Sequence, residues 1–485
     1  MNNVLMKMSK NLRTNIKKHG GIETIRENAR NEAQYDRRNK LFNHLFLKRT
    51  KLHYGDDIEH NGDEIFTAED VRTLTKSLKK KSDKTEDILK GLTKAFIFLP
   101  AHVNIFLEEE NSLWTLVSYL TGKDSKLQIY ACYCITNVTS ADHGKGETIA
   151  KMCAPYLIAY LSSSDALKQD LCATALGNLA ADGQQLRDLL KTQGILKPLV
   201  ELFRVQSAAV IESACFAAMQ LAAGSGDIIA ELHTMGIGEL LVKCLKRPDI
   251  QKVHENIAWL LVYIAPNETH TRSLVEFGLL DIVINKLQHI CNAIKENLNG
   301  VTAFVRLLGN CAAVVSEPAI IKSFESGNLF KALTQLVSCN HTHIVKESLW
   351  VLSNIMSIRE EMALDAVDNG IIMHLSRCLN YGENIQLQAV KCLCALSSYG
   401  DSCIKAVASL NVLEFFIECL QSDNIELKHL AIQFIEMVLR LHDYGQELLM
   451  ERNIISVLEK MMESDTFPKV NDAVNDLLTL YFYIK

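Results

Sequence analysis

The feature that most constrains this chain is an apolar segment that recurs seven times, with spacings of 41, 42, 43, 47, 44 and 44 residues. The fifth position of the segment is most often an amide side chain. These fifth positions are Asn137, Asn178, Gln220, Tyr263, Asn310, Asn354 and Ser398. A period near 42 residues is typical of stacked helical repeats. Because such repeats bury their apolar faces only against their neighbours, we expect one array with a continuous core.

A glycine followed by apolar residues opens another helical segment after most copies. The segments are GILKPLVELF at 194, GIGELLVKCL at 236, GLLDIVINKL at 278, GNLFKALTQLV at 327 and GIIMHLSRCL at 370. Their apolar residues recur every three or four positions, which indicates amphipathic helices. The pattern predicts an all-α fold, an armadillo-repeat right-handed superhelical solenoid of about nine to ten repeats. We interpret each glycine-headed segment as the long third helix of its repeat, and the helix ahead of it as the lining of a concave surface.

The charge divides the chain into a basic arm and an acidic body. Residues 1–53 contain 13 Lys and Arg against 4 Asp and Glu, a net charge of +9; the whole chain carries −6, so the rest carries −15. We expect a basic amino-terminal helical arm at 1–53, an acidic flexible linker at 54–66 and the repeat domain at 67–485. A basic arm can bind nucleic acid, a membrane surface or an acidic protein, or fold back on its own acidic body.

The recurring amides predict a ladder that binds an extended peptide. Each Asn side chain offers one acceptor and two donors, which match the backbone of a peptide. Aromatic residues between the rungs can wall slots for the stems of Lys and Arg. Alternatively, Trp259 and Trp350 are packing residues, and Asn137 and Asn178 brace neighbouring helices. The candidate binding residues are Tyr133, Asn137, Asn178, Asp182, Phe216, Gln220, Trp259, Arg306, Asn310, Trp350 and Asn354.

Three pairs of residues in succession carry a resemblance to a known family. They are Trp259 with Tyr263, Arg306 with Asn310, and Trp350 with Asn354. The chain resembles importin alpha (karyopherin alpha), in which a Trp-x-x-x-Asn motif recurs, the fifth repeat has Tyr for Asn and the sixth has Arg for Trp. The resemblance implies a nuclear-import adaptor of cytoplasm and nucleus that binds proteins bearing basic nuclear localisation signals. It implies that Asp182 contacts the most critical lysine of the signal, and that an export receptor binds the repeat around residues 425–485.

The arm resembles the importin-beta-binding segment of the same family. The matching positions are Arg30, Arg38, Phe46, Leu47, Lys48 and Arg49. By this resemblance the arm binds importin beta, and in its absence the end at Lys48 and Arg49 occupies the chain's own groove as an internal pseudo-signal. The alternative is a solvated basic tail. The resemblance also predicts that Thr67 caps the first repeat helix, with Glu69 and Asp70 in its first turn.

The chain also departs from the family. Thr174 stands where the family has Trp, Gln220 stands where it has Asn, and Lys391 stands where it has an acidic residue. In the eighth repeat the Trp and Asn positions are Cys394 and Ser398. We therefore expect weakened or altered cargo recognition. The alternative function is a divergent importin-alpha-like scaffold whose groove binds a different protein and no longer transports cargo.

The residues do not favour a disulfide-bonded protein, a zinc protein, an enzyme or a membrane protein. The cysteines are mostly single within apolar stretches, as in a reducing compartment. The pairs Cys132/Cys134 and Cys392/Cys394 lack a second pair at zinc-site spacing. We expect no enzyme activity and no catalytic residue, no metal and no cofactor, and no signal peptide or membrane span. We expect nucleic acid to contact the arm weakly at most.

Overall fold

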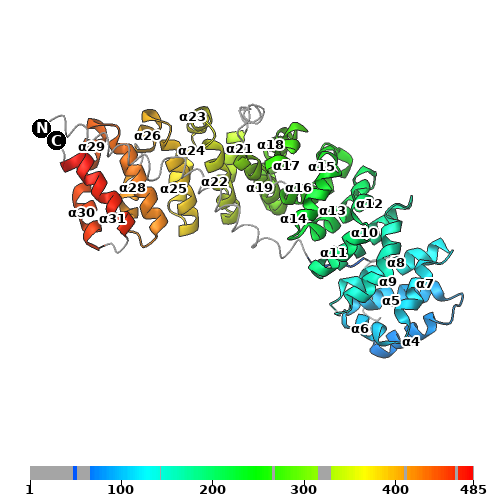
Figure 1. The fold of residues 1–485 in the computed structure, drawn as a ribbon. Coiled ribbons are helices and arrows are strands. Elements are labelled where there is room, and N and C mark those ends of the chain that lie inside the picture. The colour runs from blue at the N-terminus through cyan, green and yellow to red at the C-terminus, as the bar shows by residue number, and fades with distance from the viewer. Residues whose placement is uncertain are drawn as a thin grey trace. The chain divides into compact units, whose positions relative to one another are not determined.

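The computed structural model describes residues 47–51, 66–142, 144–264, 268–314, 329–408, 412–464 and 468–483 of the chain. These residues are mostly helical and contain no β-strand (Figure 1). They form two compact units, an amino-terminal unit that ends at Phe277 and a carboxy-terminal unit that begins at Gly278. The predicted all-α class is confirmed. The expected arm helix, with Arg30, Arg38 and Phe46, lies outside the described residues, as does most of the acidic linker.

The amino-terminal unit is a succession of short and long helices. They are α4 (Ala68–Leu78), α5 (Thr85–Phe98), α6 (Ala101–Glu108), α7 (Ser112–Leu120), α8 (Ser125–Ser140), α9 (Gly146–Tyr160), α10 (Ala166–Ala181), α11 (Gln184–Thr192), α12 (Leu196–Glu201), η1 (Leu202–Arg204), α13 (Ala208–Ala222), α14 (Gly226–Thr234), α15 (Ile237–Leu245), η2 (Pro248–Val253), α16 (His254–Ile264) and α17 (Glu268–Glu276). Among them α8, α10, α13 and α16 pack side by side in that order. We call these four the ladder helices of this unit, because each carries one of the recurring fifth positions in its second half.

The carboxy-terminal unit repeats the pattern. Its elements are α18 (Leu279–Ile290), η3 (Cys291–Glu296), α19 (Leu298–Val314), α21 (Leu329–Val337), α22 (Thr342–Met356), α23 (Glu360–Asp368), α24 (Ile371–Cys378), α25 (Glu383–Ser397), α26 (Asp401–Ala408), α27 (Val412–Cys419), α28 (Ile425–Leu439), α29 (Asp443–Met450), α30 (Ile454–Ser464), α31 (Pro468–Leu478) and η4 (Thr479–Tyr483). Its ladder helices α19, α22 and α25 pack in a row that continues with α28. The ladder positions again fall late in their helices or at the C-cap.

The glycine-headed segments are not the long helices of their repeats, so that interpretation is wrong. The helix after Gly194 has 6 residues and the helix after Gly236 has 9, whereas α10 has 16. Both glycines have positive φ, 84° and 78°, which ends one helix and lets the next begin in a new direction. The ladder helix is the long one because neighbouring helices surround it. In α10 every residue from Lys168 to Ala180 is buried, so it shows no amphipathic stripe.

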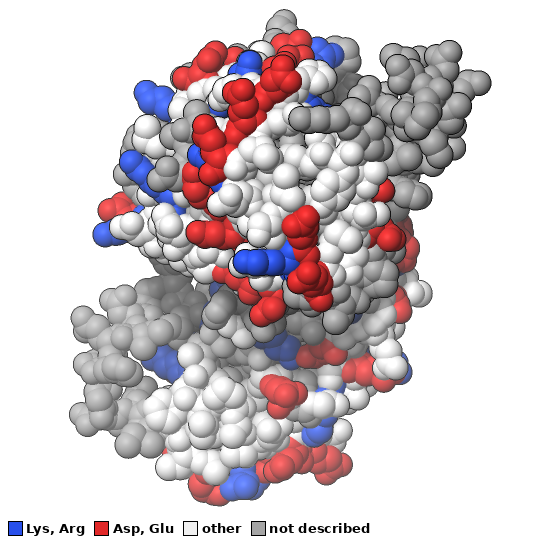
Figure 2. Space-filling view, turned by 90° about the vertical axis from the view of Figure 1, so that its left-hand side faces the viewer, with Lys and Arg blue, Asp and Glu red and all other residues white. Residues whose placement is uncertain are grey.

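Side chains at the N-cap begin several of the helices. Thr67 and Asp70 form a capping box at α4, each side chain bonded to the other's backbone N–H, which confirms the predicted N-cap. Asp124 and Asp165 cap α8 and α10 in a similar way. Outside the core, carboxylates gather in bands on the face drawn in Figure 2, with cations scattered among them. This agrees with the acidic balance of the chain after residue 53.

Candidate functional site: a peptide-binding ladder

Residues 47–51 lie across the ladder helices of the amino-terminal unit, and two asparagines hold their backbone. The Arg49 N–H donates to Asn178 Oδ1 at 2.8 Å, and Asn178 Nδ2 donates to the Arg49 carbonyl oxygen at 2.8 Å. Asn137 makes the same pair of bonds with Lys51, at 2.9 and 3.0 Å. Because Arg49 bonds to α10 and Lys51 bonds to the earlier helix α8, the segment runs antiparallel to the order of the helices.

These four hydrogen bonds form a backbone clamp, which recognises the main chain of the segment and not its side chains. Asn137 and Asn178 are buried late in their helices, and a buried amide group needs hydrogen-bond partners. The segment supplies both a donor and an acceptor to each of them. Asn178 Nδ2 also lies 3.2 Å from the Thr136 carbonyl oxygen and 3.3 Å from Thr139 Oγ1. Asn178 therefore both holds the segment and braces α10 against α8.

Lys48 enters an acidic corner between two helix ends. Its ammonium group forms an ion pair with Asp182, the C-cap residue of α10. It also donates to the carbonyl oxygen of Ala141, the C-cap residue of α8, at 3.3 Å. The carbonyl groups at the C-terminus of a helix carry partial negative charge and attract cations. Carboxylate and helix end together favour a lysine.

Arg49 lies over an aromatic ring. Its guanidinium carbon is 4.4 Å from the centre of the Phe216 ring, within the range of a cation–π contact. Its Nη1 is 3.2 Å from Glu212 Oε1 in an ion pair whose glutamate side chain is 45% exposed. Such a partly exposed pair contributes on the order of 1 kcal/mol or less. The buried ring therefore does much of the orienting of Arg49.

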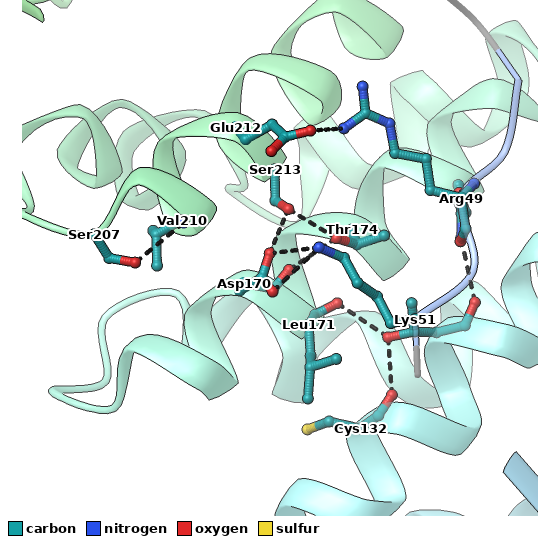
Figure 3. A network of polar contacts seen from close by, with 12 residues as sticks. Arg49, Lys51, Cys132, Asp170, Leu171, Thr174, Ser207, Val210, Glu212 and Ser213 are labelled. Carbon is teal, nitrogen blue, oxygen red and sulfur yellow. Dashed lines mark hydrogen bonds and ion pairs between the residues drawn. The ribbon is translucent and has the colours of Figure 1, made fainter. Parts of the chain in front are cut away.

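Lys51 reaches a carboxylate that is itself held in place. Its Nζ lies 3.0 and 3.2 Å from the two carboxylate oxygens of Asp170, and Ser213 Oγ donates to the same carboxylate at 2.5 Å (Figure 3). Asp170, Glu212 and Ser213 were not among the residues predicted from the sequence. A signal for the acidic pair was present, because Asp170 and Glu212 each lie four residues before the aromatic position of their ladder helix, which is Thr174 in α10 and Phe216 in α13.

The other residues predicted in this unit are Tyr133, Gln220 and Trp259, and they lie on α8, α13 and α16. Tyr133 is buried in α8 and Trp259 in α16. Gln220 of α13 is buried, and its Nε2 has no hydrogen-bond partner within the described part of the chain. Leu47 at the start of the segment is 64% exposed. The described segment therefore uses two ladder amides of this unit.

In the carboxy-terminal unit the predicted residues lie on α19 and α22. Arg306 Nη2 is 3.0 Å from Glu347 Oε1, and both side chains are buried. Trp350 packs against Gly309 of α19, which directly precedes Asn310. Asn354 is buried, and its Nδ2 finds no hydrogen-bond partner among the residues described. The structure thus pairs a cation of the ladder helix α19 with a carboxylate of α22.

On the next ladder helix, α25, a cation replaces the carboxylate. Lys391 of α25 stands three residues before Cys394, as Glu347 stands three residues before Trp350. Its ammonium group forms an ion pair with Glu426 of α28. Cys394 and Ser397 of the same helix bond to backbone carbonyl groups in the core. The cation at this position is therefore paired with a carboxylate of the chain itself, Glu426.

Other kinds of site would be a metal site, a reactive thiol or a membrane-spanning helix. Within the described ranges no three His, Cys, Asp or Glu residues gather as a metal site. All the cysteines are free thiols, and burial raises the pKa of Cys134 to about 12, far from that of a reactive thiol. None of the helices in those ranges has the length and apolar character needed to cross a membrane.

Comparisons with known proteins agree with the resemblance noted in the sequence. No protein-family model matches the chain. It is 28% identical over 386 residues to importin subunit alpha-9 of Arabidopsis thaliana, covering 74% of this chain and 72% of that protein. It is 25% identical over 390 residues to importin subunit alpha-2 of Oryza sativa subsp. japonica, covering 76% and 72%. A crystal structure of an engineered protein matches its fold with a TM-score of 0.72 at 22% identity, covering 86% of this chain and 99% of that one.

Proposed function

Because the chain is a divergent armadillo-repeat protein similar to importin alpha, we propose that it is a nuclear-import adaptor. It binds Lys- and Arg-rich nuclear localisation signals on the face that carries Asn137 and Asn178. The observation that supports this most is the double backbone clamp on Arg49 and Lys51. A clamp on main-chain groups accepts any extended peptide, and the carboxylates beside it select cations. The chain's own residues 47–51 are then an internal stand-in for a signal.

The same contacts support a regulatory role for the arm. A tethered segment competes with free cargo at a high effective concentration, because it never leaves the neighbourhood of its site. Importin beta binds the basic arm of residues 1–53 and withdraws residues 47–51 from the ladder. Binding of importin beta and loading of cargo are therefore coupled positively. An export receptor binds the carboxy-terminal repeat at 425–485, and the protein moves between cytoplasm and nucleus without catalysing a reaction.

The test is a competition between the segment and a free signal. A fluorescent bipartite basic peptide is titrated with the full chain and with a triple variant, Lys48→Ala, Arg49→Ala and Lys51→Ala. We expect the triple variant to bind the peptide at least about tenfold more tightly, because the internal competitor is gone. A matched control removes three equal charges from the exposed end of α4, as Lys79→Ala, Lys80→Ala and Lys81→Ala. That control should bind like the parent chain.

The two parts of the proposal fail separately. If neither the parent nor the triple variant binds the basic peptide, the chain is not an adaptor for basic signals. If both bind it equally, the adaptor stands and autoinhibition is wrong. A peptide with Glu in place of its lysines should bind neither protein, since Asp182 and Asp170 would repel its carboxylates.

A second function is favoured by one observation in the carboxy-terminal unit. Lys391, paired with Glu426, puts a cation where a basic signal would need a carboxylate. This supports a divergent scaffold whose carboxy-terminal ladder binds a partner other than a basic signal. Failure of the basic peptide to bind the triple variant would favour this scaffold over the adaptor.

A further inference from the structure

The slot that holds Lys51 differs chemically from the slot that holds Arg49. Phe216 of α13 presents a ring to Arg49, and the glutamate beside it is nearly half exposed. In α10 the position that corresponds to Phe216 is Thr174, which is fully buried and offers no ring. The guanidinium group of Arg gains from stacking on a ring, whereas the ammonium group of Lys is a compact point charge. The two slots therefore present different surfaces to a cation.

The carboxylate in the Lys51 slot is fixed from behind. Ser213 of α13 donates to Asp170 Oδ1, and Thr174 Oγ1 lies 2.9 Å from both Ser213 Oγ and the Asp170 carbonyl oxygen (Figure 3). Ser213 and Thr174 are wholly buried, and the Asp170 side chain is 10% exposed. A buried hydroxyl bonded to a carboxylate limits its rotation, because breaking the bond leaves a buried polar group without a partner. Asp170 can neither retreat nor turn freely.

The Lys51 side chain is also fixed at its backbone end. Asn137 holds the backbone of Lys51 on both sides, and Nζ then meets both oxygens of Asp170 at 3.0 and 3.2 Å. In an arginine, Cζ occupies the place of the lysine Nζ, and the Nη atoms extend about 1.3 Å further. With the backbone and the carboxylate both held, an extended arginine would come too close to Asp170 and would have to fold up.

We propose that Asp170, Ser213 and Thr174 form a lysine-selective slot, so that the ladder prefers Lys to Arg at the peptide position of Lys51. Asp170 contacts the ligand, and Ser213 and Thr174 are positioning residues that act through it. This inference rests on the proposed function and deepens it, because it names the side chain that this subsite accepts. It applies equally to the chain's own segment and to a cargo signal.

The experiment compares two peptides on the full chain. The receptor is the triple variant Lys48→Ala, Arg49→Ala and Lys51→Ala, which frees the ladder. The probes are a labelled peptide with the sequence of residues 47–52, Leu-Lys-Arg-Thr-Lys-Leu, and the same peptide with Arg as its fifth residue. We expect the lysine peptide to bind about tenfold more tightly, the effect of roughly one charged hydrogen bond.

Variants then separate positioning from simple packing. Adding Ser213→Ala should weaken the lysine peptide several-fold and reduce the preference for Lys to within about threefold, because Asp170 is free to turn. Thr174→Val, which keeps the shape and removes the hydroxyl, should shift the preference in the same direction by less. The control is Ser397→Ala, which removes a buried hydroxyl from α25 and should leave the preference unchanged. Circular dichroism checks that each variant is folded.

The outcomes distinguish this inference from the function on which it rests. If the receptor binds neither peptide, the proposed function fails. If it binds both peptides with equal affinity, the function stands and the lysine-selective slot is wrong. A folded Ser213→Ala protein that keeps the full preference overturns the positioning role of Ser213. If Ser213→Ala does not fold, Thr174→Val decides: an unchanged preference rejects the inference, and a reduced one supports it.

Discussion

The Phe216 ring of α13 rests on the bare backbone of Gly177 in α10, where a Cβ atom would lie 2.6 Å from Phe216 Cε1. The carboxy-terminal unit repeats this relationship. A Cβ atom on Gly309 of α19 would lie 2.0 Å from Cζ3 of Trp350 in α22. In both helices the glycine directly precedes the ladder asparagine. A missing side chain thus makes room for the aromatic residue beside each of these ladder amides.

Gly177→Ala tests this close approach. Alanine improves helix propensity by about 1 kcal/mol, but the forced movement of a buried ring costs roughly 1–3 kcal/mol. We expect a net loss in the free energy of unfolding, measured with urea, and weaker binding of an Arg-containing peptide to the triple variant. Gly226→Ala in α14 is the control, since nothing lies within 4 Å of its Cβ position. Equal stability of the two variants would show that Phe216 yields without cost.

Asn137 and Asn178 should respond differently to replacement. The described contacts of the Asn137 side chain are with Lys51, whereas Asn178 also bonds to Thr136 and Thr139. In the triple variant we expect Asn137→Ala to weaken peptide binding about tenfold, for two lost hydrogen bonds, with little change in melting temperature. Asn178→Ala should lower both affinity and melting temperature. A large drop in the melting temperature of Asn137→Ala would make that residue a brace as well.

Lys391 should limit the use of the carboxy-terminal ladder by a bipartite signal. Lys391→Gln removes a cation from the row and releases Glu426 from its ion pair. We expect the affinity for a bipartite basic peptide to rise several-fold, and the affinity for a monopartite peptide to stay constant. The control is Lys405→Gln, which removes an exposed lysine from α26. A rise for both peptides, or with the control, would point to net charge instead of this slot.

His233 predicts a loss of stability in mild acid. Its ring stacks on His270 with the ring centres 3.5 Å apart, and burial, together with His270, lowers the pKa of His233 from 6.5 to about 4. As the pH falls from 6.5 to about 4, His233 binds a proton in the unfolded chain but not in the folded chain, so the free energy of unfolding falls over this window. Above pH 6.5 the ring is neutral in both states, and its contribution to stability is complete. Urea unfolding at a series of pH values measures this slope.

The control for His233 is an exposed histidine. His233→Gln should reduce the slope between about pH 6.5 and about pH 4, because one of the two half-buried rings no longer titrates. The matched variant is His289→Gln, which removes an exposed imidazole from α18. Equal slopes in the parent chain and the His233 variant would mean that the ring is protonated in the folded protein.

Several helix boundaries could be located in the sequence because their signals are local. Thr67 begins α4 through contacts three residues away, and glycines such as Gly194 and Gly236 mark the ends of helices by their conformation. The relative lengths of the helices could not be predicted. A helix such as α10 is buried on nearly every side, so its apolar residues follow no stripe that would show where it ends.

The candidate site was predictable in part for the same reason. The recurrence of Asn137 and Asn178 singles out these positions, and their use by cargo remains a prediction. Ser213 has no sequence signal, because its role depends on the carboxylate of Asp170 on a different helix 43 residues away. In the sequence, Thr174 is noticeable only because the family has Trp at this position. The role of its hydroxyl depends on Ser213 of α13, the helix packed against it.

By itself the sequence determined the all-α class, the spacing of the repeats and the division into a basic arm and an acidic body, because periodicity and charge depend on residue types near one another. Only the tertiary structure decided that Arg49 meets Asn178, 129 residues away, and that Asp170 faces Lys51 with Ser213 behind it. Contacts of this kind depend on how separate helices pack. The chemistry of each slot is set where those helices meet, and the order of residues along one helix does not record it.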